Sequence, residues 1–144
     1  SFVFRSKRPF HPERFLNYIN TDFPQNIIRS KGLFWLGSRP DQALVWSSAG
    51  GSIKTEPAGV WWASMPANER FDYVPFVENQ ELIEKDWDKQ FGDRKNELVF
   101  IGIDINEKVI RPKLNECLMT DDELRNFNWK TPRKDQWPIP EMVH

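Results

Sequence analysis

The chain has 144 residues, a net charge of −1 and an aromatic content of 14%. A length of this order suits one domain with a single core, and a near-neutral chain has no overall field to attract nucleic acid or an anionic membrane. No apolar run reaches the roughly 18 residues of a membrane helix, and the lone Cys117 cannot form an internal disulfide, which indicates a reducing, cytoplasmic setting.

The first two predicted elements are a strand and a helix. Residues 2–5 form a short alternating run that predicts a strand, and its start directly after Ser1 leads us to expect a piece of a longer protein. Pro12 follows His11 and suits the first position of a helix, where its missing N–H has no partner in any case. We expect this helix to end before Pro24 and to bury one apolar stripe, made of Phe15, Leu16 and Ile19.

Short apolar runs separated by turn residues come next. Residues 33–36 and 44–46 flank a turn rich in Gly, Pro and Asp, which predicts a hairpin. Two further strands are expected, one around residues 53–55 and one at residues 60–65. The segment SSAGGS at residues 47–52 is interpreted as a hairpin turn, because it lacks the Gly-Lys-Ser/Thr end of a phosphate-binding loop.

The second half of the chain predicts three helices and one strong strand. Residues 78–89 predict an amphipathic helix whose buried face carries Leu82, Ile83 and Trp87. Residues 97–104 predict a strand. Pro112 would break a helix begun at residue 106, so we expect that helix to start near Pro112 and to bury Leu114, Cys117 and Leu118. Thr120 and Glu123 predict a capping box for a last helix that contains Leu124 and Phe127.

These elements predict one α+β domain over residues 1–129, followed by a Pro-containing tail over residues 130–144 that is ordered only if it docks. The domain should hold a mainly antiparallel sheet of about four to five strands with helices on one face, similar to a ferredoxin-like split β-α-β unit. The strands at Leu33, Leu44 and Leu98 are apolar on both faces, so the second face should also be covered. The cover could come from more of this chain, a missing domain, a second copy or a ligand.

No group of residues predicts a catalytic or cofactor-binding site. His11 is the one candidate metal ligand, since a helix N-terminus favours a neutral imidazole. A structural zinc site needs about four protein ligands, and no others stand at ligand spacing, so we interpret His11 as a helix cap. Cys117 is interpreted as a core residue, and three acids near strand ends and turns as local hydrogen-bond acceptors: Asp93, Asp104 and Glu107.

Four residues are candidates for binding a partner: Arg8, Arg39, Trp46 and Trp61. An alternative reading of the same features is a nucleic-acid-binding sheet of the RNA-recognition-motif kind, which would use strand aromatics and the basic N-terminal segment. The Lys/Arg-Gly-Phe core of that motif is absent and the net charge is slightly negative, which disfavours nucleic acid as a partner.

Six blocks of sequence resemble one known family in their order and spacing: RPFHPERF at 8–15, SKGLFWLGSRP at 30–40, WSSAGG at 46–51, EPAGVWW at 56–62, ELVFIGIDI at 97–105 and CLMTDDE at 117–123. Together they are similar to the C-terminal domain of the CobW-type GTP-dependent metallochaperones. The resemblance extends from about residue 2 to residue 127. Pro112 departs from the straight helix expected after FIGIDI in that family.

The resemblance implies a role in zinc or other metal delivery and homeostasis, or in cobalamin-related metal handling. In that family the domain follows a P-loop GTPase with a Cys-x-Cys-Cys metal motif, and this chain has neither. We therefore expect no enzyme activity and no cofactor in this fragment, whereas GTP, Mg²⁺ and Zn²⁺ are implied for the full-length protein. The implied partners are the N-terminal GTPase domain of the same protein, a metalloprotein client and a second copy.

Overall fold

The computed structural model describes residues 1–126 and 130–139. Its centre is a five-stranded sheet in the order β1-β5-β2-β3-β4, in which every neighbouring pair is antiparallel. The strands are β1 Phe2–Ser6, β2 Ile27–Phe34, β3 Gln42–Ala49, β4 Ser52–Val60 and β5 Asn96–Gly102. β5 lies antiparallel between β1 and β2, which makes β1-α1-β2 a split β-α-β unit. The predicted α+β fold is confirmed.

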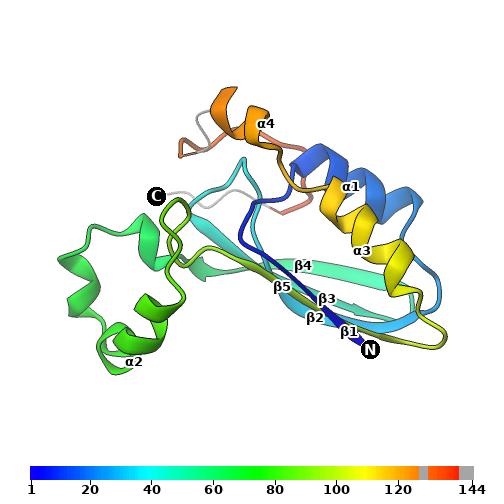
Figure 1. Ribbon diagram of the computed structural model, residues 1–144, viewed down its shortest axis with the longest axis horizontal. Helices are drawn as coiled ribbons and strands as arrows, with labels where there is room; N and C mark the ends of the chain where they lie inside the picture. The colour runs from blue at the N-terminus through cyan, green and yellow to red at the C-terminus, as the bar shows by residue number, and fades with distance from the viewer. Residues whose placement is uncertain (127–129, 140–144) are drawn as a thin grey trace.

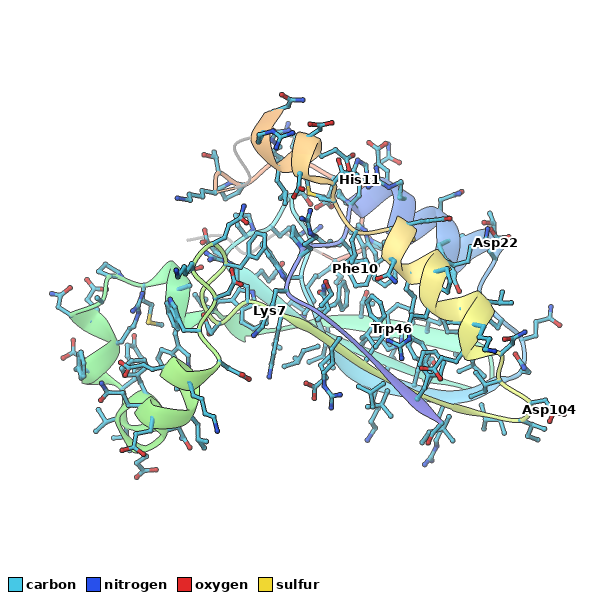
Figure 2. All side chains as sticks on the ribbon, viewed as in Figure 1. Lys7, Phe10, His11, Asp22, Trp46 and Asp104 are labelled. Atoms are coloured by element: carbon cyan, nitrogen blue, oxygen red, sulfur yellow. The ribbon has the colours of Figure 1, made fainter. Side chains whose placement is uncertain are left out.

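Two helices cover one face of this sheet: α1 Pro12–Thr21 and α3 Glu107–Glu116 (Figure 1). Between them and the strands lies a core dominated by aromatic rings. Phe10 and Phe15 stack with their ring centroids 3.8 Å apart, and Phe15 also stacks on Trp46 at 5.6 Å. Figure 2 places Phe10 and Trp46 in this layer between the helices and the sheet. Aromatic rings from the strands, from α1 and from the turn before it therefore form the centre of this core.

The β2–β3–β4 meander was predicted, but two of its strands were misplaced. The strand expected at residues 33–36 is β2, which starts at Ile27 and ends at Phe34. Gly50 and Gly51 make the β3–β4 turn at φ values of 57° and 86°, which glycine adopts without strain. The expected strand at residues 60–65 is wrong, because β4 already runs from Ser52 to Val60 and a 3-10 helix, η1 Trp62–Ser64, follows. The Asp93 carboxylate accepts hydrogen bonds from Trp62 N at 2.9 Å and Ala63 N at 2.8 Å, which turns the chain away from the sheet.

Residues 62–92 leave the sheet and form a separate projection, which we call the lobe (Figure 1). It contains η1, a second 3-10 helix η2 Glu69–Asp72, and α2 Val74–Lys85. The helix therefore lies four residues earlier than expected, since Pro75 occupies its first turn and Tyr73 N-caps it. The expected burial of Leu82 is also wrong: 69% of Leu82 is exposed, and Phe76 is the buried residue of α2.

The last two helices differ in how well local sequence predicted them. α3 starts at Glu107, not near Pro112, and contains Pro112 in its interior. Burial of Ile110 and Leu114 in the core offsets the one backbone hydrogen bond that a proline cannot donate. The capping box of α4 Asp121–Asn126 is confirmed, with Thr120 N donating to Glu123 Oε1 at 2.9 Å and Glu123 N to Thr120 Oγ1 at 3.2 Å. Phe127 lies outside the described residues.

Residues 130–139 pack against the domain. Trp137 and Ile139 are buried in the main core, and Trp137 Nε1 donates to the Pro12 carbonyl at 2.8 Å. The Asp135 carboxylate pairs with Arg39, with an oxygen 2.8 Å from Nη2. The sequence predicted that this tail is ordered only if it docks, and its residues 130–139 are docked here. The division of the chain at residue 130 stays a prediction. In the part of the chain described, no helix is both long and apolar enough to cross a bilayer.

Candidate functional site

The sheet presents its two faces to different surroundings. Strand pairing places Phe2, Phe4, Leu98, Phe100 and Trp46 on the face that α1 and α3 cover. The alternate residues form the other face, which no helix or strand of the described residues covers (Figure 1). We call it the open face. It comprises Val3, Arg5, Arg29, Lys31, Leu33, Val45, Ser47, Ala49, Ser52, Lys54, Glu56, Glu97, Val99 and Ile101.

The open face combines apolar and basic side chains. Val45 is 36% exposed and Ile101 48% exposed, while Val3, Leu33 and Val99 are half-buried between them. The register places Val45 beside Leu33 and Ile101 two rows away, with Val99 in the row between them. Apolar side chains in successive rows of an uncovered sheet face indicate an interaction surface. The sequence predicted apolar residues on both faces of the sheet, and Leu33, Val45 and Val99 are such residues on this one. The predicted cover of this face stays a prediction, because the described residues leave Val45 and Ile101 exposed.

Positive charges outnumber negative ones on the open face. Arg5, Arg29, Lys31 and Lys54 are all exposed there. The carboxylates are Glu56 and Glu97, and Glu97 Oε2 lies 3.4 Å from Arg5 Nε and 3.9 Å from Lys95 Nζ. The face therefore has a net positive charge and suits a partner with acidic and apolar groups.

Three of the four candidate partner-binding residues lie inside the domain. Trp46 is 1% exposed, and its indole Nε1 donates to Ser30 Oγ at 2.6 Å. Trp61 is buried in a smaller cluster with Trp35, and Arg39 is buried in its ion pair with Asp135. The role that the structure shows for these three residues is packing and ion pairing within the domain. A role for them in binding a partner stays a prediction.

Arg8 remains partly exposed but has partners within the chain. Its Nη1 donates to the Met119 carbonyl at 3.2 Å, and its Nη2 pairs with Asp121. These contacts attach the turn before α1 to the junction between α3 and α4. A role for Arg8 in binding a partner stays a prediction.

His11 caps α1, as the sequence suggested. Its Nδ1 accepts a hydrogen bond from Arg14 N at 3.3 Å, and its Nε2 lies 3.6 Å from Glu123 Oε2. Burial, followed by the neighbouring Arg14 guanidinium, lowers the pKa of His11, while Glu123 acts to raise it. Figure 2 shows His11 at the start of α1, beneath α4. The imidazole is thus a structural contact between two helices.

Zinc is the metal that the family resemblance implies, and the donor set does not fit it. Within residues 1–126 and 130–139, no three His, Cys, Asp or Glu side chains come together to hold a metal ion. Glu123, the carboxylate nearest His11, is already bound by Arg14 through two contacts of 2.7 Å. Burial raises the pKa of the Cys117 thiol to about 11, so it stays protonated at neutral pH.

The three acids that the sequence predicted to be local hydrogen-bond acceptors have different surroundings. Asp93 accepts hydrogen bonds at the base of the lobe, and Glu107 pairs with Arg111 within α3. Asp104 follows the far end of β5, where its φ of 52° marks a tight turn (Figure 2). Asp93 and Glu107 thus accept local hydrogen bonds, as the sequence predicted.

The open face also bears on the nucleic-acid alternative. An RNA-binding sheet stacks bases on exposed aromatic rings. The aromatic residues of the described strands point to the covered face instead, and the open face has none. The position of the strand aromatics on the covered face was not predicted from the sequence, because no strand residue was assigned to a face of the sheet. The alternation of Arg29, Lys31 and Leu33 against Ser30, Gly32 and Phe34 was the available signal.

Comparisons with known proteins agree on the kind of domain. A family model described as the cobalamin synthesis protein cobW C-terminal domain matches residues 1–118. The zinc-regulated GTPase metalloprotein activator 1 of Dictyostelium discoideum is 38% identical over 127 residues, which cover 86% of this chain and 26% of that protein. A zinc chaperone of Mycobacterium tuberculosis is 33% identical over 123 residues, which cover 84% of this chain and 30% of that protein.

A solved structure shares the fold at low sequence identity. The Zn(II)-bound YjiA GTPase from E. coli superposes with a TM-score of 0.50 and 15% identity, covering 82% of this chain and 29% of that one. The chain thus spans between a quarter and a third of the length of the proteins it matches.

Proposed function

This chain belongs to the family of CobW C-terminal domains, and from that premise we propose that it is the regulatory and interaction domain of a longer GTP-dependent zinc metallochaperone. The family domain is the non-catalytic part of CobW-type GTPases, and this fragment is not itself an enzyme. The proposal assigns GTP, Mg²⁺ and Zn²⁺ to the remainder of the longer protein, in a cytoplasmic setting.

The names of the relatives support zinc as the metal. One is a zinc-regulated GTPase metalloprotein activator and another a zinc chaperone. By analogy we propose that the longer protein hydrolyses GTP and delivers zinc to a metalloprotein client. Its GTPase domain, the client and a second copy are the proposed partners of this domain.

The observation that carries the proposal is the open face. A sheet with one face on a core normally shows polar residues on the other, whereas here Val45 and Ile101 are exposed on a face whose net charge is positive. Because the fragment brings together no metal-ligand group among its described residues, its contribution is best explained by protein contacts.

Two measurements test the proposal. The isolated chain should show no GTP turnover and no tight zinc binding by calorimetry. A stoichiometric site with a submicromolar dissociation constant would overturn the assignment of zinc to the rest of the protein.

The second measurement uses the longer protein. Val45→Asp with Ile101→Asp should reduce the effect of zinc on its GTP turnover, because both charges disturb the open face. Val109→Asp is the matched control, since Val109 is 55% exposed on α3, on the other side of the sheet. An unchanged zinc effect in the double variant, or an equal loss in the control, would refute a role for the open face.

A further inference from the structure

The lobe carries a second exposed apolar surface. α2 packs its inner side, with Phe76, onto Trp62 at a ring distance of 5.2 Å and onto Phe71 at 5.4 Å. Its outer side repeats at helical spacing and is exposed: Val74, Val77, Glu78, Glu81 and Leu82. Lys85 ends this stripe. A helix in solution normally shows polar residues on this side, so the stripe is suited to a partner.

The lobe is also strongly acidic. Residues 62–92 contain seven Asp or Glu and three Lys or Arg, so they carry −4, and the remainder of the 144-residue chain carries +3. The acids of the outer stripe, Glu78 and Glu81, lie between its apolar residues. The stripe therefore fits a surface that is both apolar and basic.

The open face of the sheet has this composition. Ile101 lies beside Arg29 on it, and Lys31 and Lys54 lie in the row between Ile101 and Val45. The neighbours of Val45 itself are Leu33 and Glu56. With four exposed basic residues against Glu56 and Glu97, the charge of this face is net positive. Two stripes facing each other would juxtapose like charges, and so would two open faces, which costs several kcal/mol at an interface. A stripe against an open face brings opposite charges together and buries both apolar patches.

The outer stripe of α2 and the open face do not cover each other within one chain. Val77 and Leu82 are exposed in the same chain in which Val45 and Ile101 are exposed. Hydrogen bonds at the base of the lobe fix its position away from the open face of the same chain. The Asp93 carboxylate accepts from Trp62 N and Ala63 N, and Arg94 Nη2 donates to Ser64 Oγ at 3.0 Å. Complementary surfaces that do not meet within a chain can meet between chains.

We propose that the outer stripe of α2 in one copy docks on the open face of a second copy. This inference rests on the proposed function, because it names an occupant for the open face. The contact joins two different surfaces, so each copy retains one free stripe and one free face. Repeated contacts then build rings or open chains of copies.

Charge reversal on each surface tests the docking. The 144-residue chain should associate reversibly in sedimentation velocity at low salt, and high salt should weaken the association because it screens exposed charges. Glu78→Lys with Glu81→Lys should weaken association about tenfold or more, and so should Arg29→Glu with Lys31→Glu. Combining all four substitutions in one chain should restore it, since the two surfaces exchange their charges.

Controls separate a lost contact from a lost fold. All four residues are exposed, so far-ultraviolet circular dichroism should be unchanged. Lys108→Glu with Lys113→Glu makes a similar charge change on α3, away from both surfaces, and should leave association unchanged. A wild-type chain that stays monomeric at low salt, a two-residue variant that associates like wild type, or a four-residue variant that fails to recover would each overturn the proposal.

The outcome is independent of the test of the proposed function. If the chain is monomeric but the open-face variant of the longer protein loses its zinc effect, the open face has another occupant and the proposed function stands. If the isolated chain binds zinc tightly or hydrolyses GTP, the proposed function fails whether or not copies associate.

Discussion

Replacing Asp135 by an uncharged residue should destabilise the whole domain, because the buried guanidinium of Arg39 then has no negative partner. The side chains of Arg39 and Asp135 are 6% and 1% exposed. The carboxylate accepts from Arg39 Nε at 2.9 Å, from Ser38 Oγ at 2.5 Å and from Trp137 N at 3.0 Å. Burial, the largest influence, acts to raise the pKa of Asp135, but these hydrogen bonds outweigh it and the pKa is lowered. The group is therefore ionised at neutral pH.

Breaking a buried ion pair from one side costs about 3–5 kcal/mol, which is a large share of the 5–15 kcal/mol that holds a typical domain. With a urea slope of about 2 kcal/mol/M, Asp135→Ala should lower the urea midpoint by about 1.5–2.5 M. Tryptophan fluorescence is a suitable probe because the chain has seven tryptophans.

Two further variants isolate the cause. Arg39→Met with Asp135→Leu should recover at least half of the loss, because it removes both charges together. Arg5→Ala should cost less than about 1 kcal/mol, since the Arg5–Glu97 side chains are 69% and 42% exposed. If Asp135→Ala costs no more than Arg5→Ala, residues 130–139 are not docked in solution and the reasoning is refuted.

Three shorter predictions concern other parts of the fold. Because Arg14 hydrogen bonds lower the pKa of Glu123 from 4.5 to about 2, its ionised form stabilises the folded chain above pH 4.5, and that stability is lost as the pH falls toward 2. Glu123→Gln should therefore flatten the acid side of the stability profile in urea titrations, and a profile parallel to wild type would contradict this. Gly32→Ala should lower the free energy of unfolding by about 2 kcal/mol or more, since a Cβ there would overlap the backbone of β5. Gly50→Ala, where the Cβ has open space but φ is 57°, should lower it by about 1 kcal/mol. Equal thermal midpoints for the two variants would refute the clash at Gly32. Trp137→Ala should cost about 3–5 kcal/mol in the same assay and Trp137→Phe clearly less, and a Phe variant as unstable as the Ala variant would show that ring packing is not the cause.

Local rules predicted the elements that depend on neighbours in sequence. Pro12 marked the start of α1, and Thr120 with Glu123 marked the start of α4, because capping is decided within one turn of a helix. The start of α3 was predicted too late in the chain, because the helix-breaking effect of Pro112 was considered without the packing of its neighbours. The burial of Ile110 and Leu114, which lets the helix continue through Pro112, is a tertiary effect.

Contacts across long sequence separations were not predictable. Nothing near Trp137 indicates that it packs beside Phe15, more than a hundred residues earlier. Trp46 looked like a binding residue because strand alternation identifies two faces without saying which one the helices cover. The alternation of residues 29–34 separates the two faces of β2, but only the register of β2 against β3 and β5 shows which residues of the neighbouring strands share the open face.

The base of the lobe has a consequence for how this domain tolerates change. The chain departs at Ala63 and returns at Gly92, and these two residues touch, since a side chain at Gly92 would collide with Ala63. The two ends of the segment between them therefore lie next to each other, as the ends of an inserted module do. Within this segment Phe91 is part of the domain's packing, because its ring centroid lies 5.5 Å from that of Trp35. Loop-closure entropy grows only slowly with length, so the part between Ala63 and Phe91 is the one that should tolerate shortening or exchange.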